Sequence, residues 1–470
     1  MSQPLDAIII GAGSAGLAAL REVRKRSDRV RIVNDGPWGT TCARVGCMPS
    51  KMLIEAANAY HRRHAFETFG IRGADGLSVD LPAVLGRVRA LRDEFVAGTE
   101  KASAVGDQGI SGHARLRGPG TVEVGGQTYH ARSIIIATGS RPLIPEEWLA
   151  FGDRILTTDT LFEQPTLGPR MAVIGLGPLG AELAQALSRL GVEVAAFSTG
   201  QSVAGLSDPD INGTLKALLK GEFVVSLGEE ARLREVPGGI EVTNGGTTVV
   251  VDQVLAAMGR RPNIEHLGLD TLGVPLDPHG KPPVDANTMQ IADLAVFMAG
   301  DADDRRPLLH EASDEGHIAA LNAMAPEPLG FRRRTPLSIV FTQPNAAVVG
   351  RAWKDLKEDE FVTGSVDFSR QGRARAAQHN QGRLSVYAER ESGRILGAEL
   401  CAPSGEHLAH LLALAIDRSL TVQDLLRMPF YHPVLEEGLR TALRDAASHL
   451  PTGSASDLSA CSAYGASALD

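Results

Sequence analysis

Two cysteines five positions apart, Cys42 and Cys47, have the clearest chemical potential in this sequence. They are half of the four cysteines in 470 residues, and they lie in the stretch GTTCARVGCMPSK at 39–51. A close pair in a chain so poor in thiols is typical of redox chemistry or metal binding rather than of a disulfide scaffold. Redox chemistry is favoured, because two thiolates need further metal ligands and no CxxC or nearby histidine supplies them.

The spacing of this pair sets a geometric condition. Residues five apart on a regular helix rise roughly 7.5 Å along its axis, whereas the Cα atoms of a disulfide lie about 4.4–6.8 Å apart. A disulfide is therefore possible only if the first turn is distorted, and Gly46 supplies the freedom for that. Cys47 should lie near the N-terminus of a helix through Met52 and Ala56, where a thiolate is stabilised.

Two glycine-rich turns are the next elements that could position chemistry. Each follows a short apolar run, at 7–10 and at 171–174, and each precedes a helical pattern. Their glycines are Gly11, Gly13 and Gly16 in the first unit and Gly175, Gly177 and Gly180 in the second. Strand, glycine turn and helix together make the dinucleotide fingerprint, in which the pyrophosphate meets the helix N-terminus. Two such units imply two dinucleotides, most simply a flavin and a nicotinamide.

Composition narrows the class of protein. A length of 470 residues predicts roughly three domains. A hydrophobic content of 43% with 22% charged residues is typical of a soluble globular chain, and a net charge of -9 argues against a nucleic-acid partner. The sequence has no apolar run of about 18 residues, and its opening lacks a basic leader. We therefore expect a cytoplasmic protein with no membrane partner.

Over residues 6 to about 447, the chain resembles the pyridine nucleotide–disulfide oxidoreductases, and within that family the dihydrolipoamide dehydrogenases. The resemblance is carried by the two glycine turns, GTTCARVGCMPSK, ATGSRP (137–142), MGRRPN (258–263), AGDA (299–302) with LLHEASDEG, FTQPNAAVVG (341–350) and YHPVLEEGL (431–439). It implies an α/β fold with two Rossmann-like dinucleotide-binding domains and a C-terminal α+β dimerisation domain.

The family's domain order can be placed on this sequence. The resemblance implies a discontinuous FAD-binding domain at 1–149 and 279–334, interrupted by an NAD(P)-binding domain at 150–278. An interface domain follows at 335–450. The small, polar residues 451–470 are expected to form a flexible tail. The family forms homodimers, so we expect a homodimer with an active site shared between subunits.

The resemblance also assigns roles at the cysteine pair. It implies that Cys42 exchanges with the substrate and that Cys47 lies against the flavin. Lys51 is expected at the reactive edge of the flavin, paired with Glu182. Other residues placed by the resemblance at the cofactors are Thr41, Thr138, Gly139, Gly259, Arg260, Gly300 and Asp301, and no metal site is expected.

A proton acceptor is expected from the segment YHPVLEEGL. The resemblance implies that His432 takes the proton of the incoming dithiol and comes from the other subunit. A carboxylate on the second ring nitrogen would fix the tautomer and stabilise the imidazolium. Spacing favours Glu437 for this role over the adjacent Glu436.

Three departures from the family pattern bear on specificity. Arg44 stands where the family usually has asparagine. Its side chain either adds positive charge near the cysteines or points to solvent. Asn34, followed by Asp35, stands at the glutamate that binds the FAD ribose, and an amide can still bond to a hydroxyl. Ser198 stands at the acid that binds the NAD ribose, and no arginine follows to hold a 2′-phosphate. We expect NAD, with NADP as the alternative.

The expected activity is oxidation of dihydrolipoamide, free or on a lipoyl protein, through Cys42, Cys47 and FAD to reduce NAD. The alternatives are an NADPH-dependent reductase like glutathione reductase or mercuric reductase, and a weakly active flavoprotein subunit of a multienzyme complex. Mercuric reductases carry a C-terminal cysteine pair, whereas this tail has only Cys461, and they lack the histidine found here at 432. Cys401 follows an apolar strand and is expected to be a buried small residue.

Overall fold

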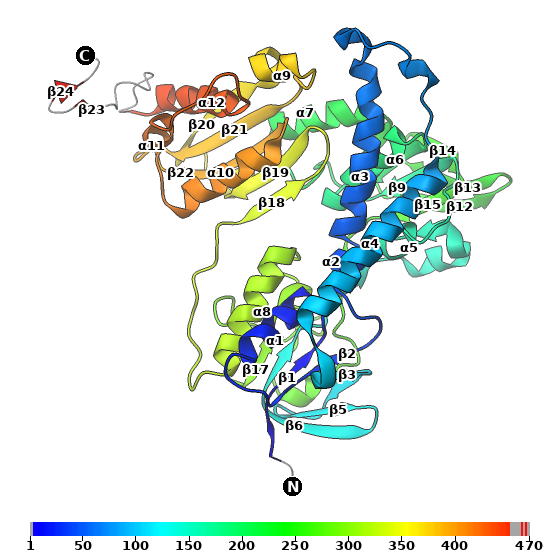
Figure 1. The fold of residues 1–470 in the computed structure, drawn as a ribbon, viewed down its shortest axis with the longest axis vertical. Helices are drawn as coiled ribbons and strands as arrows, with labels where there is room; N and C mark the ends of the chain where they lie inside the picture. The colour runs from blue at the N-terminus through cyan, green and yellow to red at the C-terminus, as the bar shows by residue number, and fades with distance from the viewer. Residues whose placement is uncertain (1–2, 452–461, 464–465, 468–470) are drawn as a thin grey trace.

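The computed structural model describes residues 3–451, 462–463 and 466–467. Two units with parallel sheets and one unit with an antiparallel sheet make up the molecule (Figure 1). The expected tail at 451–470, including Cys461, therefore lies almost wholly outside the described residues. A short pair of strands, β23 (Ser462–Ala463) and β24 (Ala466–Ser467), is described within it.

The first sheet surrounds the first glycine turn. Its order is β3-β2-β1-β6-β5-β4, with β17 also paired to β6, and the pairs among β3, β2, β1, β6 and β17 are parallel. The strands are β1 (Leu5–Ile10), β2 (Val30–Asn34), β3 (Gly109–Ser111), β4 (Ala114–Leu116), β5 (Thr121–Val124), β6 (Gln127–Ile136) and β17 (Val296–Met298). Because β17 comes from far along the chain, this unit is discontinuous.

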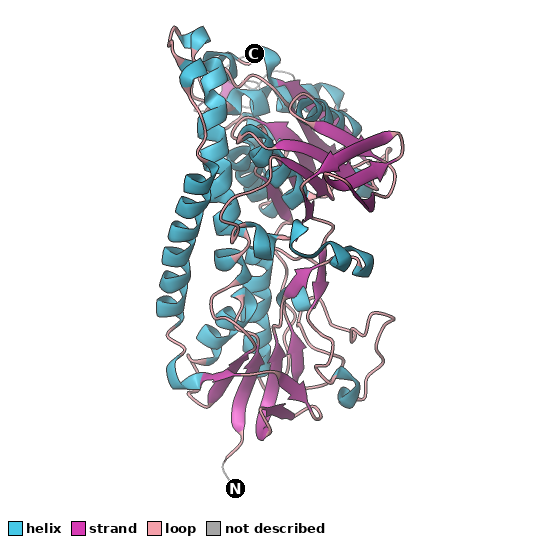
Figure 2. Ribbon diagram, turned by 90° about the vertical axis from the view of Figure 1, so that its right-hand side faces the viewer, coloured by secondary structure: helices cyan, strands magenta, loops and turns pink. Residues whose placement is uncertain are grey.

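Helices cover the first sheet because its central strands are apolar on both faces. The residues of β1 from Ala7 to Ile10 are almost fully buried. Helices α1 (Ser14–Val23) and α8 (Leu309–Ala323) pack closely, since a Cβ at Gly316 would stand only 2.0 Å from the Ala15 carbonyl oxygen. In Figure 2 this sheet lies at the N-terminal end of an elongated molecule, with the other large sheets toward the opposite end.

The second parallel sheet surrounds the second glycine turn. Its order is β11-β10-β9-β15-β8. The strands are β8 (Ile155–Leu156), β9 (Arg170–Ile174), β10 (Glu193–Ser198), β11 (Val224–Leu227) and β15 (Gln253–Ala256). Its helices are α5 (Thr158–Leu161), α6 (Pro178–Arg189) and α7 (Pro209–Lys220), and an antiparallel sheet adds β12 (Arg232–Val236), β13 (Gly239–Asn244) and β14 (Thr247–Val251).

Three helices and a small ribbon connect the two parallel units. The helices are α2 (Thr41–Arg44), α3 (Cys47–His61) and α4 (Leu81–Ser103). Leu53 of α3 belongs to the same hydrophobic core as Leu183 and Leu187 of α6. The ribbon pairs β7 (Ser140–Pro142) with β16 (Arg260–Pro262), which brings the motifs ATGSRP and MGRRPN together.

The C-terminal unit is an antiparallel sheet in the order β18-β19-β22-β21-β20. Its strands are β18 (Leu337–Val340), β19 (Asn345–Gly350), β20 (Phe361–Asp367), β21 (Arg383–Glu389) and β22 (Ile395–Ala402). Its helices are α9 (Gly372–Ala376), α10 (Gly405–Asp417), α11 (Val422–Leu426) and α12 (Glu436–His449), and the unit has a hydrophobic core of its own. The expected fold class is thus confirmed, while the exact domain boundaries stay predictions.

Two smaller findings complete the fold. Cys401 on β22 is fully buried, as expected, and burial raises the pKa of its thiol to about 12. Among the helices of the described residues, none is both long and apolar enough to cross a bilayer.

Candidate active site

Cys42 and Cys47 form a disulfide, with their Cα atoms 4.7 Å apart. Gly46 makes this possible by breaking the helix between α2 and α3, where its backbone leaves the helical region at φ −118° and ψ −112°. A Cβ on Gly46 would stand 3.1 Å from the Thr41 carbonyl oxygen, so a larger residue would press on the preceding turn. The expected distortion at Gly46 is confirmed, and Cys47 is the first residue of α3.

Lys51, one turn after Cys47, pairs with Glu182 of α6. The Lys51 Nζ lies 2.8 Å from Glu182 Oε2, and the other carboxylate oxygen accepts a hydrogen bond from the Phe341 backbone N–H at 2.8 Å. The ammonium also lies 4.5 Å from the centre of the Phe341 ring. Glu182 is only 3% exposed. Its carboxylate joins Lys51 of α3 to Phe341, the residue that follows β18 in the C-terminal unit.

His432 and Glu437 lie at the start of α12. The His432 Nδ1 is 3.0 Å from Glu437 Oε1 and 3.2 Å from Oε2, and the Val434 N–H donates to the same carboxylate. The hydrogen bond to His432 is the main cause that lowers the pKa of Glu437 below its usual value. The His432 side chain is 80% exposed, and its Nε2 has no hydrogen-bond partner among the described residues.

The disulfide and this histidine–glutamate pair do not meet within one chain. Helix α12 lies in the C-terminal unit, well separated from α2 and the start of α3 in Figure 1. A site that uses both would therefore need a second copy of the chain.

The first glycine turn fits a dinucleotide. Gly11 has φ 105°, and a Cβ there would stand 2.1 Å from the Ala137 carbonyl oxygen, so only glycine suits the turn. Gly13 faces open space, and the N-terminus of α1 has no side-chain cap, which leaves backbone N–H groups for an anion. The Thr138 Oγ1 is buried without a hydrogen-bond partner in the described part of the chain, as expected of a group that awaits a ligand.

The adjoining cavity has a volume of about 460 Å³. Asn34 lines it, but its side chain also braces the turn: Oδ1 accepts from the Ala12 N–H at 3.2 Å, and Nδ2 donates to the Gly36 carbonyl at 3.1 Å. Asp35 pairs with His113 Nδ1 at 3.0 Å. The cavity therefore has polar groups that could bind the hydroxyls of a ribose. Thr41, also expected at the cofactor, is the exposed first residue of α2.

Sequence reasoning missed part of this cavity. His113, Arg141 and Glu265 line it, and Arg141 Nη2 donates to Glu265 Oε1 at 2.8 Å. That hydrogen bond is the main cause that lowers the pKa of Glu265 to about 2. Arg141 belongs to the motif ATGSRP, so the sequence could have indicated its place near the cofactor, whereas His113 lies in no such motif.

Three sequence motifs meet around Ser140. Its hydroxyl donates to Asp301 Oδ2 at 2.6 Å, while Arg260 donates from Nε to the Ser140 hydroxyl at 2.8 Å. The neighbouring Gly139 and Gly259 have φ of 68° and 104°, and the Gly300 N–H donates to a buried glutamate, Glu315, at 2.7 Å. These contacts connect Arg260 and Asp301, two of the residues expected at the cofactors, through Ser140.

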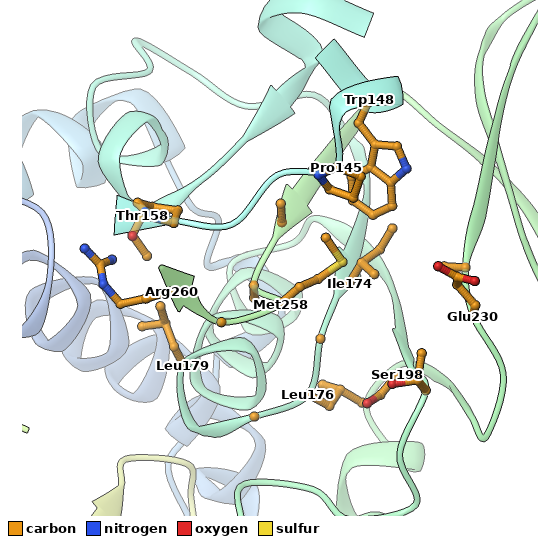
Figure 3. A pocket seen from close by; sticks show the side chains of 18 of the residues that line it. Pro145, Trp148, Thr158, Ile174, Leu176, Leu179, Ser198, Glu230, Met258 and Arg260 are labelled. Carbon is orange, nitrogen blue, oxygen red and sulfur yellow. The ribbon is translucent and has the colours of Figure 1, made fainter. Parts of the chain in front are cut away.

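The second glycine turn borders a cavity of about 520 Å³ (Figure 3). Gly175 has φ 100°, and a Cβ on it would stand 2.3 Å from the Ala257 carbonyl oxygen. A Cβ on Gly180 would stand 1.8 Å from the Gly175 carbonyl oxygen, whereas Gly177 faces open space. Ser198 lines the cavity at the end of β10, as expected, and so does Glu230, which sequence reasoning missed.

The described residues contain no group of three or more histidines, cysteines and acids that could hold a metal ion.

Two family models match the chain. Residues 5–316 match the pyridine nucleotide-disulphide oxidoreductase model, and residues 337–443 match that family's dimerisation domain. Dihydrolipoyl dehydrogenase from Thermus scotoductus is 33% identical over 93% of this chain and 96% of its own length. The human mitochondrial dihydrolipoyl dehydrogenase is 28% identical over 94% and 90%.

Solved structures share the fold. LpdA from Mycobacterium tuberculosis has a TM-score of 0.82 at 25% identity and covers 93% of this chain and 99% of its own. A Cu(II) complex of the HOCl-induced flavoprotein disulfide reductase RclA from Escherichia coli has a TM-score of 0.81 at 20% identity, with 94% and 99% covered, a likeness of fold alone. The chain belongs to the pyridine nucleotide-disulphide oxidoreductase family and is an oxidoreductase that acts on sulfur groups.

Proposed function

We propose that the protein oxidises dihydrolipoamide, free or carried by a lipoyl protein, and passes the electrons to NAD. The observation that carries the proposal is the Cys42–Cys47 disulfide at the N-terminus of α3, with the Lys51–Glu182 ion pair one turn away. The dihydrolipoyl dehydrogenases that match over nearly the whole chain support the substrate. The cytoplasmic location stays a prediction from the sequence.

The cysteine pair would act by thiol–disulfide exchange. A thiolate of dihydrolipoamide attacks the Cys42 sulfur, so a mixed disulfide forms, the Cys42–Cys47 bond breaks and Cys47 leaves as a thiolate. The second substrate thiol then attacks the substrate sulfur of the mixed disulfide, which closes the cyclic disulfide of lipoamide and releases Cys42. Two electrons and two protons have then left the substrate. The N-terminus of α3 favours the Cys47 thiolate, since the free N–H groups and the helix dipole stabilise negative charge there.

The protons need an acceptor, and the His432–Glu437 pair is suited to that role. Glu437 holds Nδ1, which leaves Nε2 to take a proton from the substrate dithiol. The carboxylate then stabilises the imidazolium that forms. Because this pair lies apart from the disulfide within one chain, we propose that the partner subunit's His432 completes each site of a homodimer.

Both nucleotides would be held by the glycine turns. The first turn, with Thr138 and the cavity that Asn34 lines, would hold FAD, and the second turn would hold NAD. Bound FAD would supply the two-electron chemistry that links the cysteine pair to the nicotinamide. Lys51 would place positive charge near the flavin, oriented by the buried Glu182 carboxylate.

The test is an anaerobic spectral titration of the purified flavoprotein with dihydrolipoamide, followed by NAD and NADP separately. We expect a long-wavelength absorption band on reduction, and reoxidation by NAD. Cys42→Ser should abolish turnover, by more than about a thousandfold, because the exchange loses its electrophilic sulfur. Cys461→Ser is the control that removes a thiol outside the pair.

Other outcomes would redirect the proposal. Reoxidation by NADP alone would keep the thiol chemistry and overturn the choice of NAD. Reduction by NADPH with no response to dihydrolipoamide would replace the proposal with an NADPH-dependent disulfide reductase.

A further inference from the structure

The end of β11 passes close to Ser198 in the nicotinamide cavity. Strands β10 and β11 are parallel, with Ser198 opposite Leu227, and the Gly228 N–H donates to the Ser198 carbonyl oxygen at 2.9 Å. Both strands therefore end at the same edge of the sheet. The residues that follow Gly228 lie at the edge where the ribose-binding acid of a dinucleotide fold is normally found.

Two glutamates follow Gly228, and their side chains have different surroundings. Glu229 turns to the β13–β14 hairpin: its carbonyl accepts a hydrogen bond from Asn244, and its Oε1 lies 3.1 Å from where a Cβ on Gly245 would stand. Glu230 instead lines the cavity. Figure 3 shows Glu230 and Ser198 on the same side of this cavity. Because the Glu230 carboxylate is exposed and has no partner among the described residues, it is free to bind a ligand.

The positive charge of the cavity lies away from Ser198 and Glu230. Among the described residues that line it, Arg260 is the only arginine or lysine. It donates to the Ser140 hydroxyl at 2.8 Å and to the Ser140 carbonyl at 2.6 Å. In Figure 3 it lies on the side opposite Glu230. Near Ser198, the described residues that line the cavity thus present hydroxyls and a carboxylate and no cation that could hold a phosphate.

We propose that Glu230 supplies the carboxylate that selects NAD over NADP, in place of the acid missing at Ser198. A carboxylate accepts charge-assisted hydrogen bonds from the two hydroxyls of the adenosine ribose. It repels the dianionic 2′-phosphate of NADP, whose charge no lining cation offsets there. This inference rests on the proposed nicotinamide site and names the residue that sets its specificity.

The experiment measures binding without turnover. ADP-ribose and 2′-phospho-ADP-ribose are titrated by calorimetry into the FAD-loaded protein, because neither probe carries a nicotinamide and neither can react. The wild-type protein should prefer ADP-ribose. Glu230→Gln should weaken ADP-ribose roughly tenfold, from the loss of charge-assisted bonds, and should strengthen the phosphorylated probe by a similar factor. The second effect should shrink as ionic strength rises.

Glu229→Gln is the matched control, since it removes the same charge one residue away from a side chain turned to the hairpin. It should leave the preference between the probes within about twofold of wild type. If Glu230→Gln changes the preference no more than Glu229→Gln does, or if the wild type prefers the phosphorylated probe, the inference is overturned and the proposed thiol chemistry stands. If the wild type binds neither probe, the nicotinamide site fails as well.

Discussion

The first glycine of each turn has a left-handed backbone, with φ 105° at Gly11 and 100° at Gly175. Each lies so close to a neighbouring strand end that a Cβ would stand 2.1 Å from the Ala137 oxygen or 2.3 Å from the Ala257 oxygen. The two turns therefore solve the same packing problem in the same way, because only glycine lets the backbone come so close to the neighbouring strand end.

The two sites differ beyond the turn. At the end of β2, the Asn34 side chain accepts a hydrogen bond from the Ala12 N–H of the first turn. Charged pairs such as Arg141–Glu265 line the first cavity. At the end of β10, Ser198 lines the second cavity together with Glu230, which lies after β11 and for which we proposed the role of the acid. The two cavities thus share the backbone of the glycine turn and differ in the side chains that follow the neighbouring strands, and our proposal assigns the choice of ribose to those side chains.

The largest effect should come from a methyl group at the central glycine of either turn. Gly13 and Gly177 have φ of −78° and −63°, which alanine adopts freely, and a Cβ on either meets no protein atom within 4 Å. The methyl would instead occupy the space that we propose for the pyrophosphate, at a cost of roughly 2–3 kcal/mol or about a hundredfold in affinity. Gly13→Ala should fold but lose FAD, while Gly177→Ala should keep FAD and lose ADP-ribose binding.

Flavin absorbance after gel filtration and calorimetry with ADP-ribose measure the two losses. Gly86→Ala in α4 is the control, because a Cβ there also meets no atom within 4 Å. Loss of FAD from Gly177→Ala would show that the two turns do not act independently.

The next largest effect should be a loss of stability when the Lys51–Glu182 ion pair is broken. Among the described residues, Lys51→Ala would leave the Glu182 carboxylate, 3% exposed, with the Phe341 N–H as its one partner. Loss of the ammonium partner should lower the free energy of unfolding by about 1–3 kcal/mol, because the carboxylate keeps one hydrogen bond but has no counter-ion. Glu182→Gln should cost less, because an amide oxygen can still accept from Phe341. Thermal melts of the two single variants and the double variant measure the coupling, and additive effects would contradict it.

Some features of the candidate site could be predicted from the sequence, and others could not. The disulfide, the role of Gly46 and the choice of Glu437 over Glu436 depended on spacings of a few positions, which local geometry controls. The Arg141–Glu265 pair joins residues 124 positions apart and exists only because β7 pairs with β16. Neither it nor the place of Glu230 has a local pattern that reveals it.

The bracing by Asn34 depends similarly on tertiary structure. An asparagine at the end of β2 could be read as a ribose ligand, but only the folded loop shows its amide bonded to the Ala12 N–H and the Gly36 carbonyl. The composition of a motif thus predicts which atoms are present, while the partners that those atoms find depend on how the loops close.

A smaller effect on stability should distinguish Asn34 at the end of β2 from Ser198 at the end of β10. Asn34→Ala removes the bond to Ala12 and should lower stability by about 1 kcal/mol, with weaker retention of FAD. Ser198→Ala removes a hydroxyl that lines an open cavity and should change stability by less than about 0.5 kcal/mol. Thermal melts and the rate of FAD loss on dilution check both. Equal effects would mean that Asn34 does not brace the turn.

The smallest effect concerns pH at the wall of the first cavity. Arg141 is the main cause that lowers the pKa of Glu265 from 4.5 to about 2 in the folded protein. A folded-state pKa below the unfolded one means that the ion pair stabilises the protein fully above pH 4.5, and that this contribution is lost as pH falls toward 2. The pair is partly exposed, so its contribution should be below about 1 kcal/mol.

Glu265→Gln should therefore lower the melting temperature near neutral pH, and the gap from wild type should close as pH falls below about 4.5. Glu229→Gln, which removes a carboxylate beside the second site, is the charge-matched control. A gap for Glu265→Gln that stays constant down to pH 3 would contradict a lowered pKa, and would mean that Glu265 stabilises the cavity wall through contacts that do not depend on its charge. Among the described residues that line the second cavity, no two form an ion pair, so the acid range would then not distinguish the two cavities.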